Sequence, residues 1–440
     1  MNSIEKLKRL TGEKAKTPEK PSPKQVQIDE LRRRIDTVML RRPDRHQIAS
    51  EKKLDADKIN LAEIVPGEET ENDHGKFFLA SEVVRGSSRH GHRNIRETFR
   101  LDMKAAALLA NEPSIAYLNS SDALFLDTET TGLAGGTGTM AFLIGLGWFE
   151  DGQFHIRQIL ARDFGEEKAV LAYLGEIAGQ KKFLVTFNGK AFDVNLLTTR
   201  FILNRLKNDL AGLPHLDLLH PSRRILGHRL ENSRLATLEA EVLGVEREDD
   251  IPGWEIPQRY FDWLRRRDGR LLASIFEHNR LDVISMASLT AHLTEILTAQ
   301  ELMQNVHAAD YLAAARLLLK RHDSCGIEKI LNMFDDRGCN EISVVSKKEL
   351  SFLYKRNGRW QEAAQIWQEL VTAMPADYST ISELAKYLEH RVHNYCHAKM
   401  LIEKALAEVN NFSPGEKEAL QHRRERLKRL ENLQKERKTD

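Results

Sequence analysis

ALFLDTETTGL, residues 123–133, is a short apolar run that ends abruptly in acidic and hydroxyl side chains. The run predicts a buried strand from Ala123 to Leu126. Residues i and i+2 of a strand point to the same face, so Asp127 and Glu129 are expected to project together. Two neighbouring carboxylates repel each other unless a cation neutralises them, and Mg²⁺ or Mn²⁺ prefers carboxylate oxygen. Because a lone D-x-E also occurs on surface strands and in helix caps, a metal site needs further acids.

A third carboxylate follows the next predicted strand, KFLVTFNG (182–189), which leads into a helix from about Ala191 to Leu206. Asp193 falls in the first turn of this helix, where the helix dipole alone favours an acid. The functional alternative is a third metal ligand that faces the end of the first strand. In that arrangement Phe192 packs beneath Asp193, and Asn188 reaches the backbone of a substrate.

The fourth acid lies in a predicted helix from Leu271 to Leu297. His278 and Asp282 are four residues apart and therefore share a helix face. Such a pair is usually an ordinary surface interaction. With three acids already placed, however, Asp282 is the expected fourth ligand. His278, with an intrinsic pKa near 6.5, suits a general base or a residue that positions water.

Three further polar features are less specific than these acids. The segment LAGGTG (133–138) lacks the Lys-Ser or Lys-Thr of a phosphate-binding loop, so it is interpreted as a tight turn beside the site. Asp217, in HLDLL, could assist the site, but a helix or turn cap is the favoured interpretation. The DIPG stretch with Trp254 could shape a substrate groove.

The order of predicted elements between residues 61 and 299 favours an α/β fold, in which helices pack on a mixed sheet as in ribonuclease H-like proteins. Residues 63–84 indicate two strands joined by a turn at Asn72–Gly75. Residues 141–160 indicate a hairpin that turns at Asp151-Gly152, a dipeptide favoured where both central residues need positive φ. A helix is expected over Glu166–Ala178.

The two ends of the chain differ from this central region in composition and in hydrophobic pattern. Residues 1–60 are rich in Lys, Glu and Pro and are expected to form a flexible charged tail. Residues 300–440 look helical, and a pattern of small and large side chains recurs after about 34 residues, as in tetratricopeptide repeats. The positions Gly358, Ala364, Trp367 and Ala373 correspond to Val392, Ala398, Leu401 and Ala407. A plain helical bundle is the alternative.

Composition limits the other possibilities. The formal net charge is +1, so binding to nucleic acid would depend on local basic patches, which could equally be solvated helix faces. These patches are Arg32–Arg34, Arg223-Arg224 and Arg265–Arg267. The three cysteines show no metal-ligand spacing, and the sequence has no secretory signal or membrane-spanning run. We therefore expect a soluble cytoplasmic protein with no membrane partner.

The order Asp-x-Glu, Asp and His-x-x-x-Asp resembles the DEDD exonuclease superfamily, over residues 123–289. Five motifs in the same order resemble the bacterial YprB family, also called mitomycin repair factor B, over most of the chain after residue 60. They are GLAGGTGTMAFLIGLG, FNGKAFDVNLL, HLDLLHPSRRIL, DIPGWEIPQRY and HNRLDVIS. The resemblance implies an exonuclease domain followed by tetratricopeptide-like helices.

The same resemblance implies a function. Asp127, Glu129, Asp193 and Asp282 would hold two divalent ions, Mg²⁺ or Mn²⁺, for 3′→5′ hydrolysis of DNA in repair. The implied substrate contacts are Thr130, Gly132, Leu133, Asn188 and Phe192. An exoribonuclease and a non-catalytic nucleic-acid-binding scaffold remain alternatives. The family resemblance also implies a DEAD-type helicase as partner.

The sequence departs from the superfamily pattern at the residue expected to act as the general base. The histidine subtype places His five residues before the last Asp, where this chain has Glu277. The tyrosine subtype places Tyr four residues before it, where this chain has His278. The assignment of His278 as base or as water-positioning residue therefore stays open.

Overall fold

The structure of the protein is a computed structural model that describes residues 58–132, 138–248, 250–299, 306–337, 342–408 and 412–439. The chain divides into two units, Met1–Lys58 and Ile59–Asp440, and all the described residues except Lys58 belong to the second. The tail predicted at residues 1–60, with its basic patch at Arg32–Arg34, lies almost entirely outside the described residues.

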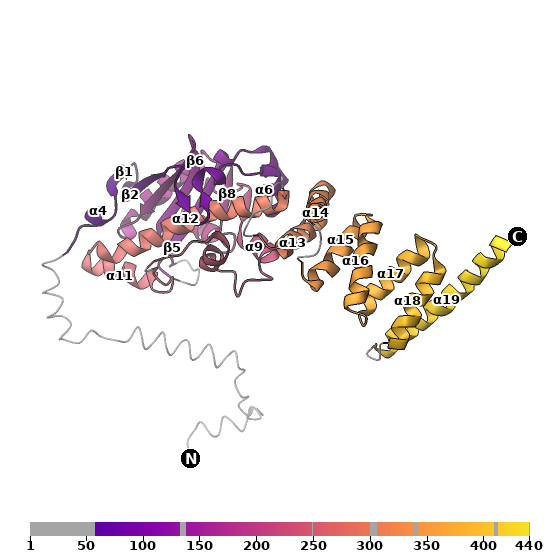
Figure 1. Cartoon of the computed structure of the whole chain (residues 1–440). Helices are drawn as coiled ribbons and strands as arrows, with labels where there is room; N and C mark the ends of the chain where they lie inside the picture. Colours follow the sequence, from indigo (N-terminus) through magenta and orange to yellow (C-terminus); the bar gives the residue numbers. More distant parts are fainter. Residues whose placement is uncertain are drawn as a thin grey trace, which may run out of the picture. The chain divides into compact units, whose positions relative to one another are not determined.

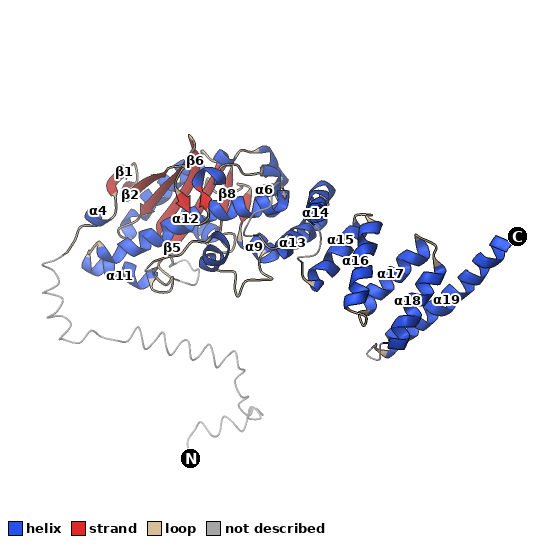
Figure 2. Cartoon of the chain, in the orientation of Figure 1, coloured by secondary structure: helices blue, strands red, loops and turns tan. Residues whose placement is uncertain are grey.

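A seven-stranded mixed sheet forms the centre of the α/β part (Figure 2), in the order β1-β2-β7-β6-β5-β8-β9. Its strands are β1 (Gly67–Asn72), β2 (Gly75–Val84), β5 (Ala123–Thr130), β6 (Ala141–Glu150), β7 (Gln153–Leu160), β8 (Phe183–Thr186) and β9 (His215–Asp217). A separate pair is formed by β3 (Arg89–His90) and β4 (Arg93–Asn94). The predicted ribonuclease H-like α/β class is confirmed.

Two hairpins account for the antiparallel half of the sheet. β1 pairs with β2 through the turn predicted at Asn72–Gly75, and β6 pairs with β7. In the second hairpin Asp151 and Gly152 have φ values of 48° and 76°, which confirms the turn expected from this dipeptide. β5 pairs antiparallel with β6 but parallel with β8, so β5 and β8 end at the same edge of the sheet.

Helices cover the sheet, and the side chains of β5 alternate between two cores. Ala123 and Phe125 belong to one hydrophobic cluster, whereas Leu124 and Leu126 belong to the other. α12 packs against β5, β6 and β7. The helices and short helical turns of the α/β part are α4 (Leu61–Ile64), α5 (Ile95–Thr98), α6 (Met103–Ala110), η2 (Pro113–Tyr117), η3 (Ser120–Asp122), η4 (Phe164–Glu166), α7 (Glu167–Ala178), α8 (Asp193–Leu203), α9 (Leu219–Ile225), α10 (Leu235–Leu238), η5 (Glu239–Leu243), α11 (Ile256–Arg266) and α12 (Arg270–Thr298).

Every regular element described in the C-terminal region is a helix (Figure 1), as expected. Its helices are α13 (Ala308–Lys320), α14 (Ser324–Arg337), α15 (Val344–Arg356), α16 (Trp360–Ala373), α17 (Tyr378–His390), α18 (Tyr395–Glu408) and α19 (Pro414–Thr439). Successive helices pack in pairs, with α15 against α16 and α17 against α18. The assignment as tetratricopeptide-like repeats and the domain boundary near residue 299 stay predictions. Among the described residues, no helix combines the length and apolarity needed to span a bilayer.

Candidate active site

Asp127 and Glu129 lie at the end of β5, and their side chains project from the same face of the strand as that of Phe125. The strand extends beyond the predicted Leu126 to Thr130, so both acids belong to it. Pairing with β6 becomes irregular between Glu129 and Thr130. The two carboxylates therefore project from the point where the regular sheet stops, as the sequence predicted.

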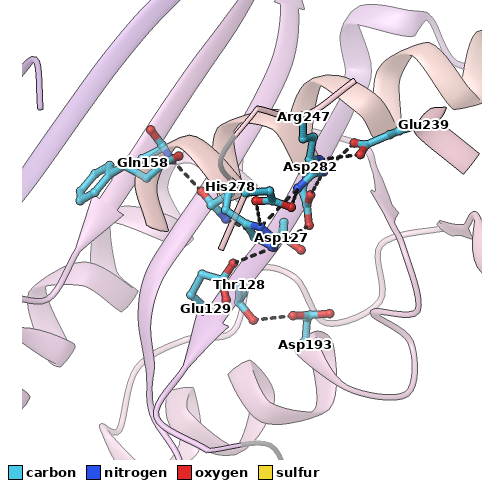
Figure 3. A network of polar contacts seen from close by, with 12 residues as sticks. Asp127, Thr128, Glu129, Gln158, Asp193, Glu239, Arg247, His278 and Asp282 are labelled. Carbon is cyan, nitrogen blue, oxygen red and sulfur yellow. Dashed lines mark hydrogen bonds and ion pairs between the residues drawn. The ribbon is translucent and has the colours of Figure 1, made fainter. Parts of the chain in front are cut away.

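Asp193 reaches the same edge from the neighbouring strand. β8 runs parallel to β5, and the turn after it leads into α8, which begins at Asp193. The Thr128 hydroxyl donates a hydrogen bond to Asp193 Oδ1, so this acid faces the end of β5 (Figure 3). The predicted helix over residues 191–206 is shorter, Asp193–Leu203.

Asp217 holds the turn that precedes α8. Its Oδ1 accepts hydrogen bonds from the backbone N–H of Asn188 (2.8 Å) and Leu219 (3.1 Å). Its Oδ2 accepts from the N–H of Lys190 at 3.0 Å. Three backbone donors on a buried carboxylate confirm the favoured interpretation of Asp217 as a cap.

His278 and Asp282 lie on α12 and face the two acids of β5. Asp250 Oδ1 lies 2.7 Å from His278 Nδ1, which leaves Nε2 on the side of the acids. That Nε2 is 3.8 Å from both Glu129 Oε1 and Asp282 Oδ2. The structure thus brings all five predicted residues together, and the pair on α12 is part of this cluster rather than a solvated helix face.

Arg247 is a member of the site that the sequence interpretation missed. It forms two hydrogen bonds of 2.6 Å with Glu239, a further ion pair with Asp282, and one of 3.2 Å with Asp250. The Arg247 side chain is 7% exposed and that of Glu239 is 1% exposed. Figure 3 shows Arg247 between Glu239 and Asp282. Asp250, from the DIPG motif, links this cation to His278.

Asn279 and Gln158 were also missed. The Asn279 amide donates to Asp127 Oδ2 at 2.8 Å and accepts from Gln158 Nε2 at 2.9 Å. A signal for this contact was present in the sequence. Gly145 and Gly147 interrupt an otherwise apolar strand, and glycine inside a strand often marks a close approach by another group.

Burial dominates the electrostatics of the acids. It raises the pKa of Asp127 well above the ordinary value, and the neighbouring Asp282 and Asp193 raise it further. Burial also raises the pKa of Glu129, with Asp127 next in importance. Burial raises the pKa of Asp193 to about 6, although the hydrogen bond from Thr128 acts against it. Burial works against the charge on Arg247, but its contacts with Glu239 and Asp282 outweigh it and raise the pKa.

These residues fit a divalent cation by their chemistry. Desolvated carboxylates that repel one another are stabilised by a hard cation, and oxygen is the ligand that Mg²⁺ and Mn²⁺ prefer. Over the described ranges, no three His, Cys, Asp or Glu side chains already converge in ligating geometry. Each of three acids has a polar partner instead: Asp127 accepts from Asn279, Asp193 from Thr128 and Asp282 from Arg247.

A pocket of about 620 Å³ opens beside Glu129 and Asp193. It is lined by Thr128, Glu129, Thr130, Gly132, Thr139, Ala191, Phe192, Asp193, Asn195, Leu196, Thr199, Gly253 and Pro257. Its size suits a ligand as large as a nucleotide. Phe192 is 56% exposed on this pocket, so the expectation that it packs beneath Asp193 was wrong. The start of α8 directs its ring to solvent instead.

The other predicted substrate contacts fall in different places. Thr130 and Gly132 line the pocket, whereas Asn188 does not. Leu133 and most of the LAGGTG segment lie outside the described residues. Gly253 of the DIPG motif lines the pocket, and Trp254 beside it is 69% exposed.

Two of the basic patches can be located. In the 265–267 patch, Arg265 pairs with Asp262, and Arg267 donates to the Arg162 carbonyl oxygen at 2.7 Å. Arg223 and Arg224 are exposed on α9. Arg224 lies beside α13, at a second pocket that is lined by several cations.

The mixed sheet and the helices packed on it define a ribonuclease H-like domain. Comparison with known families agrees, because residues 124–294 match the ribonuclease H superfamily. The chain is also 31% identical over 355 residues to the uncharacterized protein YprB of Bacillus subtilis (strain 168). The match covers 78% of this chain and 83% of that protein. The chain therefore belongs to the YprB family.

Proposed function

We propose that the protein is a divalent-metal-dependent 3′→5′ exonuclease that hydrolyses the phosphodiester bonds of DNA. One observation carries the proposal. Asp127, Glu129, Asp193 and Asp282 come from three separate elements and gather at the end of β5, where Glu129 and Asp193 line a pocket of about 620 Å³. A pocket of this size suits a single nucleotide, and attack at a chain end is what the resemblance to the DEDD exonucleases implies.

The four acids are the proposed ligands of two divalent ions, Mg²⁺ or Mn²⁺. Bound ions of this kind supply a water of lowered pKa and charge stabilisation at a phosphoryl group. The protein's own residues orient the reactants. His278, anchored through Nδ1 by Asp250, presents Nε2 toward the acids, where it can position water or accept its proton. Phe192 offers an exposed ring on which a terminal base can stack.

The decisive experiment is an assay of purified protein on 5′-labelled and 3′-labelled DNA and RNA in Mg²⁺, in Mn²⁺ and in EDTA. We expect a ladder of shortened 5′-labelled DNA, immediate release of the 3′ label, and no products in EDTA or with Asp127→Asn. Cleavage of RNA alone would replace DNA with RNA as the substrate. Failure to cleave any substrate in either metal would refute the enzyme and leave a nucleic-acid-binding scaffold.

The role in DNA repair and a DEAD-type helicase partner are proposals that rest on the family resemblance, and the cytoplasmic location is a proposal that rests on the spacing of the three cysteines. The helical region α13–α19 is the proposed contact region for that partner. A pull-down with the full-length chain, compared with a chain that ends at Ala299, tests this assignment. Equal capture by both chains would place the contact outside the helices.

A further inference from the structure

A hydrogen-bonded relay lies buried behind Asp127. Asn279 is fully buried on α12 and donates from Nδ2 to Asp127 Oδ2 at 2.8 Å. Gln158 of β7, 6% exposed, donates from Nε2 to Asn279 Oδ1 at 2.9 Å. The same Gln158 nitrogen donates to the Phe276 carbonyl oxygen at 2.7 Å. Figure 3 shows Gln158 at one end of this network and Asp127 at the other.

The relay has a fixed polarity. Gln158 Nε2 contacts two acceptors, so it must point its donors at them and cannot exchange its amide oxygen for its nitrogen. Asn279 must then present its oxygen to Gln158 and its nitrogen to Asp127. As a result Asp127 always meets a donor at Oδ2.

The sheet is shaped to admit the relay. A Cβ built on Gly145 of β6 would lie 2.2 Å from Asn279 Oδ1, closer than any side chain tolerates. Gly147, two residues further on the same face, is crowded by apolar atoms instead. Its Cβ would lie 2.5 Å from Phe154 Cζ and 2.6 Å from Val283 Cγ1. Gly145 therefore makes room for the Asn279 amide, and Gly147 makes room for packing.

We propose that Asn279 and Gln158 are positioning residues that fix the carboxylate of Asp127 for metal binding. The amide engages Oδ2 and leaves Oδ1 of the same carboxylate for a cation. This inference rests on the proposed metal-dependent function. Partners of this kind behind a metal ligand commonly contribute about 10–100-fold to metal affinity or activity.

The test compares isosteric and matched variants by calorimetric titration with Mn²⁺ and by thermal unfolding without metal. Gln158→Glu keeps the volume but removes the donor, so Asn279 turns its oxygen toward Asp127. We expect Mn²⁺ affinity to fall about 10–100-fold in Gln158→Glu and in Gly145→Ala. Gly147→Ala, which disturbs only packing, should lower the melting temperature but keep the Mn²⁺ affinity of the wild type.

The outcomes separate this proposal from the proposed function. Equal Mn²⁺ affinity in Gln158→Glu and the wild type would overturn the positioning role. So would an affinity loss in Gly147→Ala as large as that in Gly145→Ala. If the wild type itself binds no Mn²⁺, the proposed metal site fails as well. Because the titration needs no substrate, inactivity on DNA leaves the positioning test intact.

A different observation carries a second inference, at the junction of α9, α13 and α15. A groove of about 410 Å³ lies there, and cations provide most of its polar lining. Its lining residues are Arg224, Ala313, Arg316, Leu317, Leu319, Lys320 and Arg356. Arg316 pairs with Glu349 at 2.8 Å, whereas Arg224, Lys320 and Arg356 are all exposed. The pKa of Arg321 is lowered by burial and then by Arg224, which places a further cation nearby.

We propose that this groove binds the phosphodiester backbone of the nucleic-acid substrate, so that the helical region takes part in holding it. Clustered cations around a groove are the electrostatic footprint of polyanion binding. This inference also rests on the proposed function.

The test measures fluorescence anisotropy of labelled DNA at several salt concentrations, with EDTA present so that nothing is cleaved. The groove variant combines Arg224→Gln, Lys320→Gln and Arg356→Gln. The control combines Lys329→Gln, Lys404→Gln and Lys428→Gln, three exposed lysines elsewhere on the helical region, and makes the same charge change.

We expect the groove variant to bind roughly tenfold more weakly and to flatten the salt slope by about one for each phosphate that is no longer neutralised. The control should bind like the wild type. If the groove variant and the control bind DNA with the same affinity and the same salt slope, the proposed role of the groove is overturned. If the wild type itself does not bind DNA, the proposal that the protein acts on DNA is refuted instead.

Discussion

Removal of the Arg247 guanidinium is the most informative change to this site for stability. In Arg247→Met, Glu239 loses both of its 2.6 Å hydrogen bonds while its side chain stays 1% exposed. Leaving one member of a buried ion pair without its partner costs about 3–5 kcal/mol. At about 2–4 °C per kcal/mol for a domain of this size, the melting temperature should fall by roughly 10 °C.

The assay is thermal and urea unfolding in EDTA, so that no bound metal compensates for the removed cation. Arg247→Met combined with Glu239→Leu should recover most of the stability, because the uncompensated buried charge is then gone. Arg280→Met is the control, since Arg280 pairs with Glu277 near the surface, where the side chains are 28% and 53% exposed. That change should cost at most about 1 kcal/mol. A melting temperature of Arg247→Met close to that of the control would refute the reasoning, as would a double variant no more stable than the single one.

Three further predictions concern charge, substrate and pH. Asp127→Asn should abolish cleavage yet raise the melting temperature in EDTA by roughly 3 °C, because a buried repelling charge is removed; a lower melting temperature would contradict this. Phe192→Ala should raise KM for DNA about tenfold and leave kcat within about twofold, because its exposed ring contributes stacking; a loss confined to kcat would contradict the stacking role. Burial lowers the pKa of His90 to about 4 and that of His292 to about 3. At these two imidazoles the unfolded chain binds more protons below about pH 6.5, so they lower the stability as pH drops from 6.5 toward 4, whereas the raised pKa values of Asp127, Glu129 and Asp193 act in the opposite direction. Relative to the wild type, His292→Leu should therefore shift the urea midpoint upward increasingly as pH drops from 6.5 toward 4, and a difference that does not change with pH would exclude His292 as a contributor.

The sequence predicted the parts of the fold that local patterns encode. The positive φ of Asp151 and Gly152 follows from the dipeptide itself, and the alternation of Leu124 and Phe125 between two cores follows from strand geometry. The acids were predictable for the same reason, because Asp127 and Glu129 interrupt an apolar strand. Each of these features depends on neighbours within a few residues.

The residues that contact the acids come from segments distant in the sequence. Local sequence patterns therefore predict them less well than the acids themselves. Arg247 stands in a charged stretch, EREDD, that is indistinguishable from a surface loop until it meets Glu239 and Asp282. Gln158 lies 121 positions from Asn279, so the sequence offers no spacing that links them. Phe192 was placed wrongly because a strand-to-helix turn gives no rule for the direction of the side chain before the helix.

Asn279 and Arg247 differ in how they act on a metal ion. Their removal is therefore predicted to change Mn²⁺ binding in opposite directions. Asn279 is neutral and engages one oxygen of Asp127, so it orients the ligand and adds no repulsion against a cation. Arg247 is a fixed cation on Asp282, so it stabilises the free protein and repels a divalent ion that approaches the same carboxylate. Loss of the Asn279 relay should therefore weaken Mn²⁺ binding with a moderate effect on stability. Loss of Arg247 should destabilise the metal-free protein strongly, and added Mn²⁺ should then raise its melting temperature more than it raises that of the wild type.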